Sequence, residues 1–186
     1  MSPPWVIRNL FRGIDAIEVV FHFLPRQELT YRAPSVEFQV LAGQVRTLPR
    51  HASREAREAA TDAARRVLDV LKETPVVAVG FNFGYDAEAS ELDEILSSSD
   101  RGRFEENNWP LQEIAVARKI AYEDAGTLSI VLLRPGEGGT GRIDLNFHWD
   151  VLDAATADHR IRSHAEDAHR FGLLVLEQVY NLRLEQ

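Results

Sequence analysis

Alternation of large apolar residues with small or polar residues is the feature that most constrains the fold of this chain. The pattern runs through residues 14–24, 35–45, 76–85 and 142–151. Successive side chains of a β-strand point to opposite faces, so each of these segments predicts a strand with one buried face. Burial on one side only is typical of antiparallel sheets, which turn their second face to solvent.

The first two strands are expected to form a hairpin through a loop at residues 26–32. Gly43 interrupts the second of them and predicts a bulge or a bend, because glycine in a strand interior weakens the pairing. The Pro135–Gly141 segment (PGEGGTG) predicts a loose hairpin loop before the last strand.

Residues 111–123 allow two interpretations. Their alanine content and Pro110 at a first-turn position favour a helix, whereas the alternation of Ile114, Val116 and Tyr122 favours a strand. We prefer the strand, because it forms a three-stranded meander with the two segments that follow it.

Two long segments have helical periodicity, with small or apolar residues three or four positions apart. The first begins at Ala52, extends past Val70 and ends before Pro75, and the second runs from Ala157 to about Leu182. A short acidic helix is predicted at residues 87–96. Residues 97–109 lack periodicity and predict a surface loop.

These elements predict an α+β fold in the order ββαβ(α)βββα, as a single domain over residues 1–186. We expect a mainly antiparallel sheet of about six strands with both long helices packed on one face. Residues 1–12 are expected to lie outside the sheet, as an N-terminal arm that docks onto this chain or another.

Composition excludes several classes of function. The 186 residues include no cysteine, which excludes disulfides, thiolate zinc sites and cysteine nucleophiles. A formal net charge of −8 disfavours nucleic acid as a partner. The N-terminus lacks the pattern of a secretory signal, and no apolar run approaches the ~20 residues that span a bilayer. We therefore expect a cytoplasmic protein without a membrane partner.

Two pentapeptides share the pattern Asn-Phe-x-aromatic-Asp: NFGYD at residues 82–86 and NFHWD at residues 146–150. In both, alternation places the aromatic residues on the buried face and the asparagine and aspartate on the other face. One copy follows a predicted helix and the other precedes one. We therefore interpret the repeat as strand alternation and not as an internal duplication.

Candidate acid–base groups or metal ligands are Glu18, His22, Asp144 and His148. All four lie opposite the large apolar side chains of their strands, and they converge only if the first and last strands are neighbours. Isolated histidines more often have structural roles, so we expect no metal and no cofactor. HExxH, GxSxG, GxGxxG and Walker A motifs are absent.

Three further histidines, His159, His164 and His169, are spaced by five residues within the last predicted helix. That spacing turns each of them ~140° from the next, so they cannot form the i, i+4 pair of a helical zinc site. We expect them on a solvated helix face.

Three hypotheses of function follow. The preferred one is a non-enzymatic interaction or assembly protein of the bacterial cytosol, which binds another protein chain or itself through a sheet face, the N-terminal arm or the apolar end of the last helix. The second is a small-molecule-binding domain with a pocket between sheet and last helix, and the third is a small enzyme that uses the four acid–base candidates. The expected binding residues are Asn82, Tyr85, Asn146, Trp149, Phe171, Leu174 and Val175.

The stretch at residues 74–83 resembles parts of bacterial proteins of uncharacterised activity. The resemblance covers only these few residues, so it implies no family, activity or site for this chain.

Overall fold

The fold is α+β and contains two four-stranded antiparallel sheets. The computed structural model describes residues 2–11, 14, 17–22, 28–96, 101–109, 111–135 and 140–182. In chain order, the elements of this part of the chain are α1 (Pro3–Leu10), β1 (Glu18–His22), β2 (Glu28–Arg32), β3 (Val36–Leu41), β4 (Gln44–Pro49), α2 (Arg54–Val70), β5 (Ala78–Ala87), α3 (Ala89–Ile95), α4 (Arg101–Glu106), β6 (Glu113–Tyr122), β7 (Gly126–Pro135), β8 (Gly141–Asp150) and α5 (Ala154–Tyr180).

The chain divides into two compact units, and α5 contributes to both. Met1–Val76 and Leu152–Arg162 form the first unit, whereas Val77–Val151 and Ser163–Glu185 form the second. The predicted single sheet of about six strands is therefore wrong, because each unit builds a sheet of its own. The two long helices do not share the face of one sheet, since α2 packs against β3 and β4 of the first sheet. The single-domain organisation stays a prediction.

The sheet of the first unit has the order β1-β2-β3-β4, with every pair antiparallel. The prediction of two strands here is wrong in two places. The expected loop at 26–32 contains β2, whose Tyr31 is fully buried. Gly43 has a φ of 75°, so it forms the tight turn between β3 and β4 and not a bulge.

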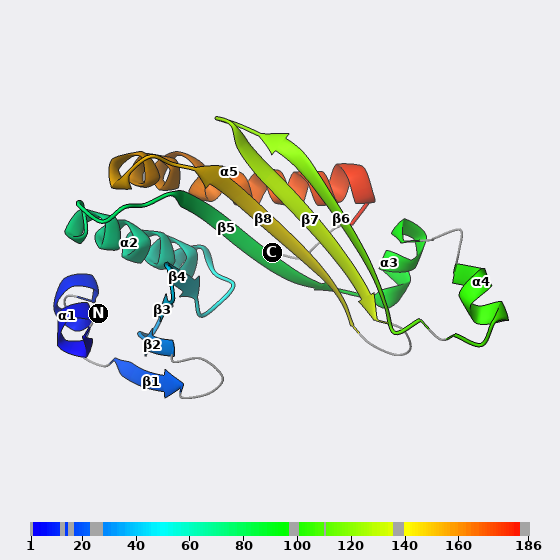
Figure 1. Cartoon of the computed structure of the whole chain (residues 1–186), viewed down its shortest axis with the longest axis horizontal. Coiled ribbons are helices and arrows are strands. Elements are labelled where there is room, and N and C mark those ends of the chain that lie inside the picture. The colour runs from blue at the N-terminus through cyan, green and yellow to red at the C-terminus, as the bar shows by residue number, and fades with distance from the viewer. Residues whose placement is uncertain are drawn as a thin grey trace. The chain divides into compact units, whose positions relative to one another are not determined.

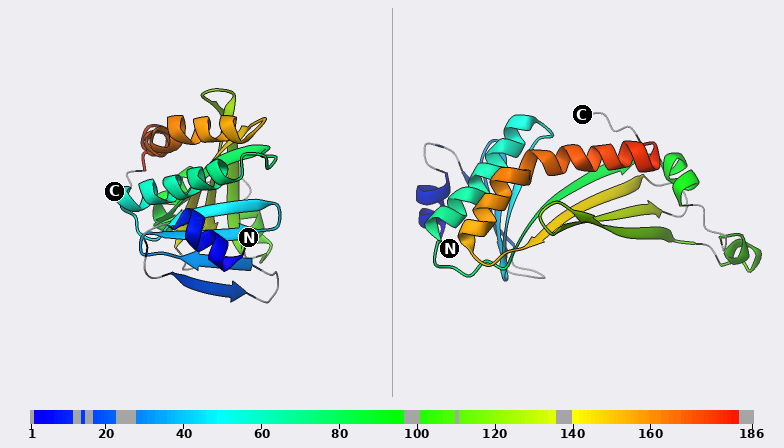
Figure 2. Two further views of the ribbon diagram at one scale, coloured as in Figure 1. Left: turned by 90° about the vertical axis from the view of Figure 1, so that its left-hand side faces the viewer. Right: turned by 90° about the horizontal axis from the view of Figure 1, so that it is seen from above.

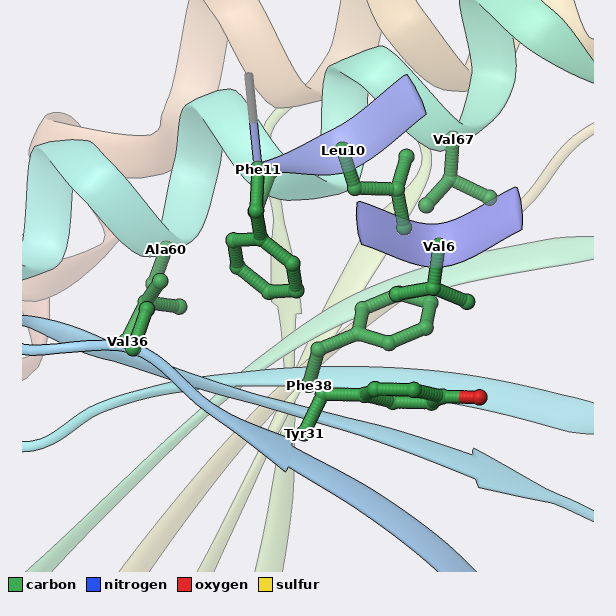
Figure 3. Packing of buried hydrophobic residues seen from close by; sticks show 10 residues of the cluster. Val6, Leu10, Phe11, Tyr31, Val36, Phe38, Ala60 and Val67 are labelled. Carbon is green, nitrogen blue, oxygen red and sulfur yellow. The ribbon is translucent and has the colours of Figure 1, made fainter. Parts of the chain in front are cut away.

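Helices α1 and α2 cover one face of this sheet (Figure 3). The rings of Phe11 and Phe38 meet edge to face at 6.3 Å, and Tyr31 lies 5.9 Å from Phe38. Burial raises the pKa of Tyr31. The N-terminal segment therefore docks within its own unit and contributes to its core. The labelled core residues are Val6, Leu10, Phe11, Tyr31, Val36, Phe38, Ala60 and Val67.

Polar contacts fix the helices of the first unit. The hydroxyl of Ser53 accepts a hydrogen bond from the Ala56 amide at 3.2 Å and caps the start of α2. Arg66 of α2 donates to the carbonyl oxygen of Leu10 at 2.8 Å, where α1 ends and leaves carbonyl groups without helical partners.

The sheet of the second unit has the order β5-β8-β7-β6, with every pair antiparallel (Figure 1). Consecutive hairpins join β6, β7 and β8, which confirms the predicted meander and the strand interpretation of residues 111–123. The second part of α5 lies along one face of this sheet, and no described helix of the unit lies across the other face (Figure 2).

Two short helices lie between β5 and β6. The predicted acidic helix is confirmed as α3, and an ion pair of 2.7 Å joins its Asp93 to Arg134 of β7. The predicted loop at 97–109 is wrong over Arg101–Glu106, where arginine and glutamate favour the short helix α4. Residues 97–100 lie outside the described residues. Among the helices of the described part, none is long and apolar enough to cross a membrane.

Asp158 gives the first unit a pH-dependent contact. Its carboxylate accepts hydrogen bonds from Arg65 of α2 at 3.1 Å and from Arg162 of α5 at 2.6 Å. Burial acts to raise the pKa of Asp158, but the two guanidinium groups outweigh it and hold the pKa below its ordinary value. The ionised form is thus favoured in the folded state, and the resulting stability is lost as the pH falls through the lowered pKa.

We predict that Asp158→Asn lowers the free energy of unfolding by about 1 kcal/mol near neutral pH. The difference in the free energy of unfolding between variant and wild type should shrink as the pH falls below the ordinary aspartate pKa. It should vanish once the wild-type carboxyl group is protonated. Denaturant unfolding at about pH 7 and about pH 3 measures both values. Asp69→Asn, at an exposed position of α2, is the matched control. An equal loss at both pH values would contradict an electrostatic origin.

Candidate functional site

The two faces of the second sheet differ sharply in burial. On β8, Ile143, Leu145, Phe147 and Trp149 are at most 1 % exposed, whereas the residues between them point the other way. We call the face under α5 the helix face and the opposite one the open face. The open face includes Ala78, Gly80, Asn82, Gly84 and Asp86 of β5, Arg142, Asp144, Asn146, His148 and Asp150 of β8, Thr127, Ser129, Val131 and Leu133 of β7, and Glu113, Ala115, Ala117, Lys119 and Ala121 of β6.

The two pentapeptides lie on paired strands and meet only at their first residues. Asn82 is directly opposite Asn146, and Phe81 is opposite Phe147. Because β5 and β8 are antiparallel, the two copies extend in opposite directions from the asparagine pair and are related by a local two-fold axis. Their aromatic residues lie on the helix face and their asparagine and aspartate residues on the open face, as the alternation predicts.

The asparagine pair belongs to a polar row that crosses all four strands. Asn82 pairs with Asn146, which pairs with Ser129, which pairs with Lys119. Both asparagines are exposed, and within the described residues neither side chain makes a hydrogen bond. Each amide offers two N–H donors and one carbonyl acceptor. The row therefore presents unused hydrogen-bonding groups along a line perpendicular to the strands.

The two rows of residues next to the asparagine row have small residues at both ends. Gly84 and Ala117 are the ends of one row, and Gly80 and Ala121 are the ends of the other. A Cβ atom on Gly80 would lie 2.5 Å from the carbonyl oxygen of Phe147, so no larger residue fits there. Small residues therefore flank both ends of the central polar row, whereas larger side chains fill the middle of the neighbouring rows: Asp144, Val131, His148 and Thr127.

Charged groups on β8 pair along their own strand. The Arg142 guanidinium binds the Asp144 carboxylate at 2.9 Å, and these two side chains lie over Gly84. Nε2 of His148 lies 3.1 Å from a carboxylate oxygen of Asp150. Both pairs are solvent-accessible and contribute at most about 1 kcal/mol to stability.

The four acid–base candidates are not brought together by strand pairing. Glu18 and His22 lie on β1, which pairs with β2, whereas Asp144 and His148 lie on β8, which pairs with β5 and β7. Glu18 forms an ion pair with Arg32 at 3.6 Å, and the side chain of His22 lies outside the described residues. No group of three or more histidine, aspartate or glutamate residues in the described ranges is arranged to hold a metal ion.

Trp149 and Phe171, predicted to line a pocket, belong to the core between the helix face and α5. Trp149 is 1 % exposed, and Phe171 lies 4.9 Å from Tyr122 and 6.4 Å from Phe147. Tyr85 also lies on this face, so the predicted binding residues are divided between the two faces of the sheet. A small-molecule pocket between sheet and helix stays a prediction.

His164 is buried, contrary to the expectation of a solvated histidine face. It is 4 % exposed, stacks on Trp149 at 5.0 Å with an interplanar angle of 14°, and directs Nε2 to the Asp124 carboxylate at 3.1 Å. His159 is exposed as expected, whereas His169 lies 5.1 Å from Phe83. The spacing of His164 from the neighbouring positions Ile161 and Ala168 places it in the buried stripe of the helix, and this is the signal that predicts its burial.

The hairpin turn between β6 and β7 is held from two sides. Trp149 donates its indole N–H to the Glu123 carbonyl oxygen at 3.0 Å, and His164 contacts Asp124. Asp124 and Ala125 have φ values of 54° and 61°, a left-handed conformation that is strained for alanine. Burial raises the pKa of the neighbouring Tyr122, and the charge of Glu123 adds to this effect.

The apolar end of α5 offers less surface than its sequence indicates. Leu174 is 43 % exposed, whereas Val175 is 9 % exposed and Leu176 is fully buried. A change at Val175 would therefore alter the core as well as any docking surface. Of these three residues, only Leu174 is exposed enough to contact another molecule.

A second surface feature lies next to α4 and was not predicted. A shallow hollow of about 220 Å³ is lined by Arg103, Phe104, Asn107 and Trp109. Trp109 is 64 % exposed, and its ring lies 6.5 Å from that of Phe104. Exposed aromatic and arginine side chains are common contact residues in protein interfaces.

No protein-family model matches the chain, and neither the curated proteins nor the solved structures compared with it include a significant match. The function of the chain is therefore inferred from its own residues.

We predict that Gly126→Ala lowers the free energy of unfolding by about 1–3 kcal/mol. A Cβ atom at this position would lie 2.3 Å from Nε1 of Trp149, whose indole is held by its hydrogen bond to Glu123. Ala125→Gly, one residue away, should leave the stability unchanged or raise it by up to about 1 kcal/mol, because it relieves the left-handed strain. Denaturant unfolding of both variants tests the packing. Equal stability of Gly126→Ala and the wild type would contradict it.

Proposed function

We propose that this chain is a non-enzymatic protein-interaction domain of the bacterial cytosol, which binds a partner protein on the open face of its second sheet. The observation that carries the proposal is the row of polar side chains across the open face, in which Asn82, Asn146 and Lys119 are exposed and Ser129 is half-buried. Unused amide groups on such a face provide the directional hydrogen bonds of a specific interface.

The dimensions of the open face suit a protein better than a small ligand. Its strands are each ten residues long, which corresponds to about 30 Å, and four strands add a width of roughly 15 Å. The product of these dimensions is roughly 450 Å², somewhat over half of the ~800 Å² that each partner buries in a standard protein interface. Small ligands favour concave sites, whereas a four-stranded sheet face offers a broad surface.

The residue types on the open face also favour a partner. Glycine and alanine are poor strand formers, and at solvent-exposed strand positions bulkier β-branched residues give more stable sheets. Ala78, Ala115, Ala117 and Ala121 are all exposed on this face. Small side chains there allow another surface to approach the backbone closely.

Electrostatics disfavour nucleic acid on this face. The carboxylates of Asp86, Asp144 and Asp150 outnumber the cationic groups of Arg142 and Lys119. The chain as a whole carries a formal net charge of −8. A phosphate backbone would therefore be repelled both locally and at longer range.

Asn146→Arg tests the proposal, because it places a long charged side chain at the centre of the polar row. The position is exposed, so the fold should be kept. We expect the complex with the partner, measured by native mass spectrometry of the tagged protein purified from its own host, to weaken by about tenfold or more.

Gln178→Arg is the matched control, since it adds the same side chain at an exposed position of α5 away from the open face. It should retain the partner. Retention of the same partner by both variants, at equal yield, would show that the open face is not the binding surface.

A further inference from the structure

The outer edge of β6 is a second surface that is open to pairing. β6 forms hydrogen bonds with β7 on one side, and in the described part of the chain no strand pairs with its other side. An edge strand of ten residues presents a line of backbone N–H and C=O groups that can accept another strand. The edge shares Lys119 with the open face, but strand pairing uses backbone groups of β6 and needs no partner protein on that face, so the inference does not rest on the proposed function.

The charges along β6 are of both signs and suit a second copy of the same strand. Glu113 and Lys119 are exposed on the same face of the sheet, and within the described residues neither forms an ion pair. The edge strand on the other side of the sheet, β5, contains Asp86 but no basic residue. Self-pairing through β5 would thus bring no opposite charges together.

We infer that two copies of this chain pair antiparallel through β6, with Val116 on the two-fold axis. In this register Glu113 lies opposite Lys119 of the second copy, and the symmetry repeats the pair at the other end. Ala115 lies opposite Ala117 of the second copy, and Val116 lies opposite its own symmetry mate. Directly opposite residues share a face of an antiparallel pair, so the opposite charges meet side by side.

Neighbouring registers are less favourable. An axis at Ala117 places Val116 opposite Arg118 of the second copy and separates Glu113 from Lys119. An axis at Arg118 places two guanidinium groups directly opposite each other, which is destabilising. Charge complementarity therefore selects the register with Val116 on the axis.

This arrangement joins two four-stranded sheets into one continuous sheet. An axis perpendicular to the sheet keeps the helix faces of both copies on the same side. It also satisfies the backbone groups of both β6 edges at once. The alternative interpretation of Lys119 is a charged residue that protects an edge strand from pairing. The two interpretations differ in whether the protein dimerises through β6.

A single introduced cysteine tests the register directly, because the chain contains no cysteine. Opposite residues of an antiparallel pair have Cα atoms about 4.5–5.5 Å apart, within the range that a disulfide spans. Val116→Cys should therefore give a disulfide-linked dimer under mild oxidation, on a non-reducing gel. Ile114→Cys serves as the control. Its opposite residue is Arg118 of the second copy, so it should give little disulfide-linked dimer on the same gel.

A charge exchange tests the same contact without a covalent bond. Lys119→Glu and Glu113→Lys each replace two attractive pairs by two repulsive ones, so each should weaken dimerisation about tenfold or more by sedimentation equilibrium. The double variant Glu113→Lys/Lys119→Glu restores both pairs and should restore the dimer. Circular dichroism confirms that each variant is folded.

Three results would overturn the inference. The first is a wild-type protein that stays monomeric up to about 100 μM. The second is a dimer whose affinity neither single charge variant alters, which would place the interface elsewhere. The third is equal cross-linking of Val116→Cys and Ile114→Cys, which would contradict the register.

Discussion

The packing of α5 on the aromatic face of the second sheet determines most of what this unit presents to its surroundings. Trp149 stacks on His164 of α5, and Tyr122 and Phe147 both contact Phe171 of the same helix. Burying a large apolar side chain stabilises a fold by roughly 2–3 kcal/mol, so several such contacts hold the helix firmly on one face. A one-residue slip of β8 would expose Phe147 and Trp149 and bury Asn146 and His148. Burial of the helix face under α5 thus determines which residues lie on the open face.

The same packing stabilises a strained turn. Asp124 and Ala125 adopt left-handed backbone conformations at the tip of the β6–β7 hairpin. Trp149 from the neighbouring strand and His164 from α5 both contact this turn, and Gly126 leaves room for the indole ring. The contacts offset the strain and fix the register of β6, whose outer edge is then presented in full. The Trp149 side chain therefore links the core of the second unit to the edge strand β6.

Much of the local structure could be predicted from residue patterns. Alternation located β5 and β8, and the alanine-rich stripe located α2, because these patterns reflect the geometry of single elements. β2 was assigned to a loop, although Leu29 and Tyr31 alternate as in the other strands. The buried position of His164 follows from its spacing from Ile161 and Ala168, whereas its spacing from the other histidines carries no information about burial. The candidate site was predicted in part: Asn82 and Asn146 were chosen, but nothing indicated that they lie opposite each other.

The sequence by itself determined which residues of each strand share a face, where the long helices lie, and that the sheets are antiparallel. These properties depend on the side-chain period of one segment and on short connections between neighbours. Only the tertiary structure decided that the strands form two sheets, that β5 pairs with β8 across the intervening meander, and that β6 is left at an edge. Strand order depends on contacts between residues far apart in the chain, which no local pattern encodes. For the same reason the polar row across four strands exists only in the folded protein.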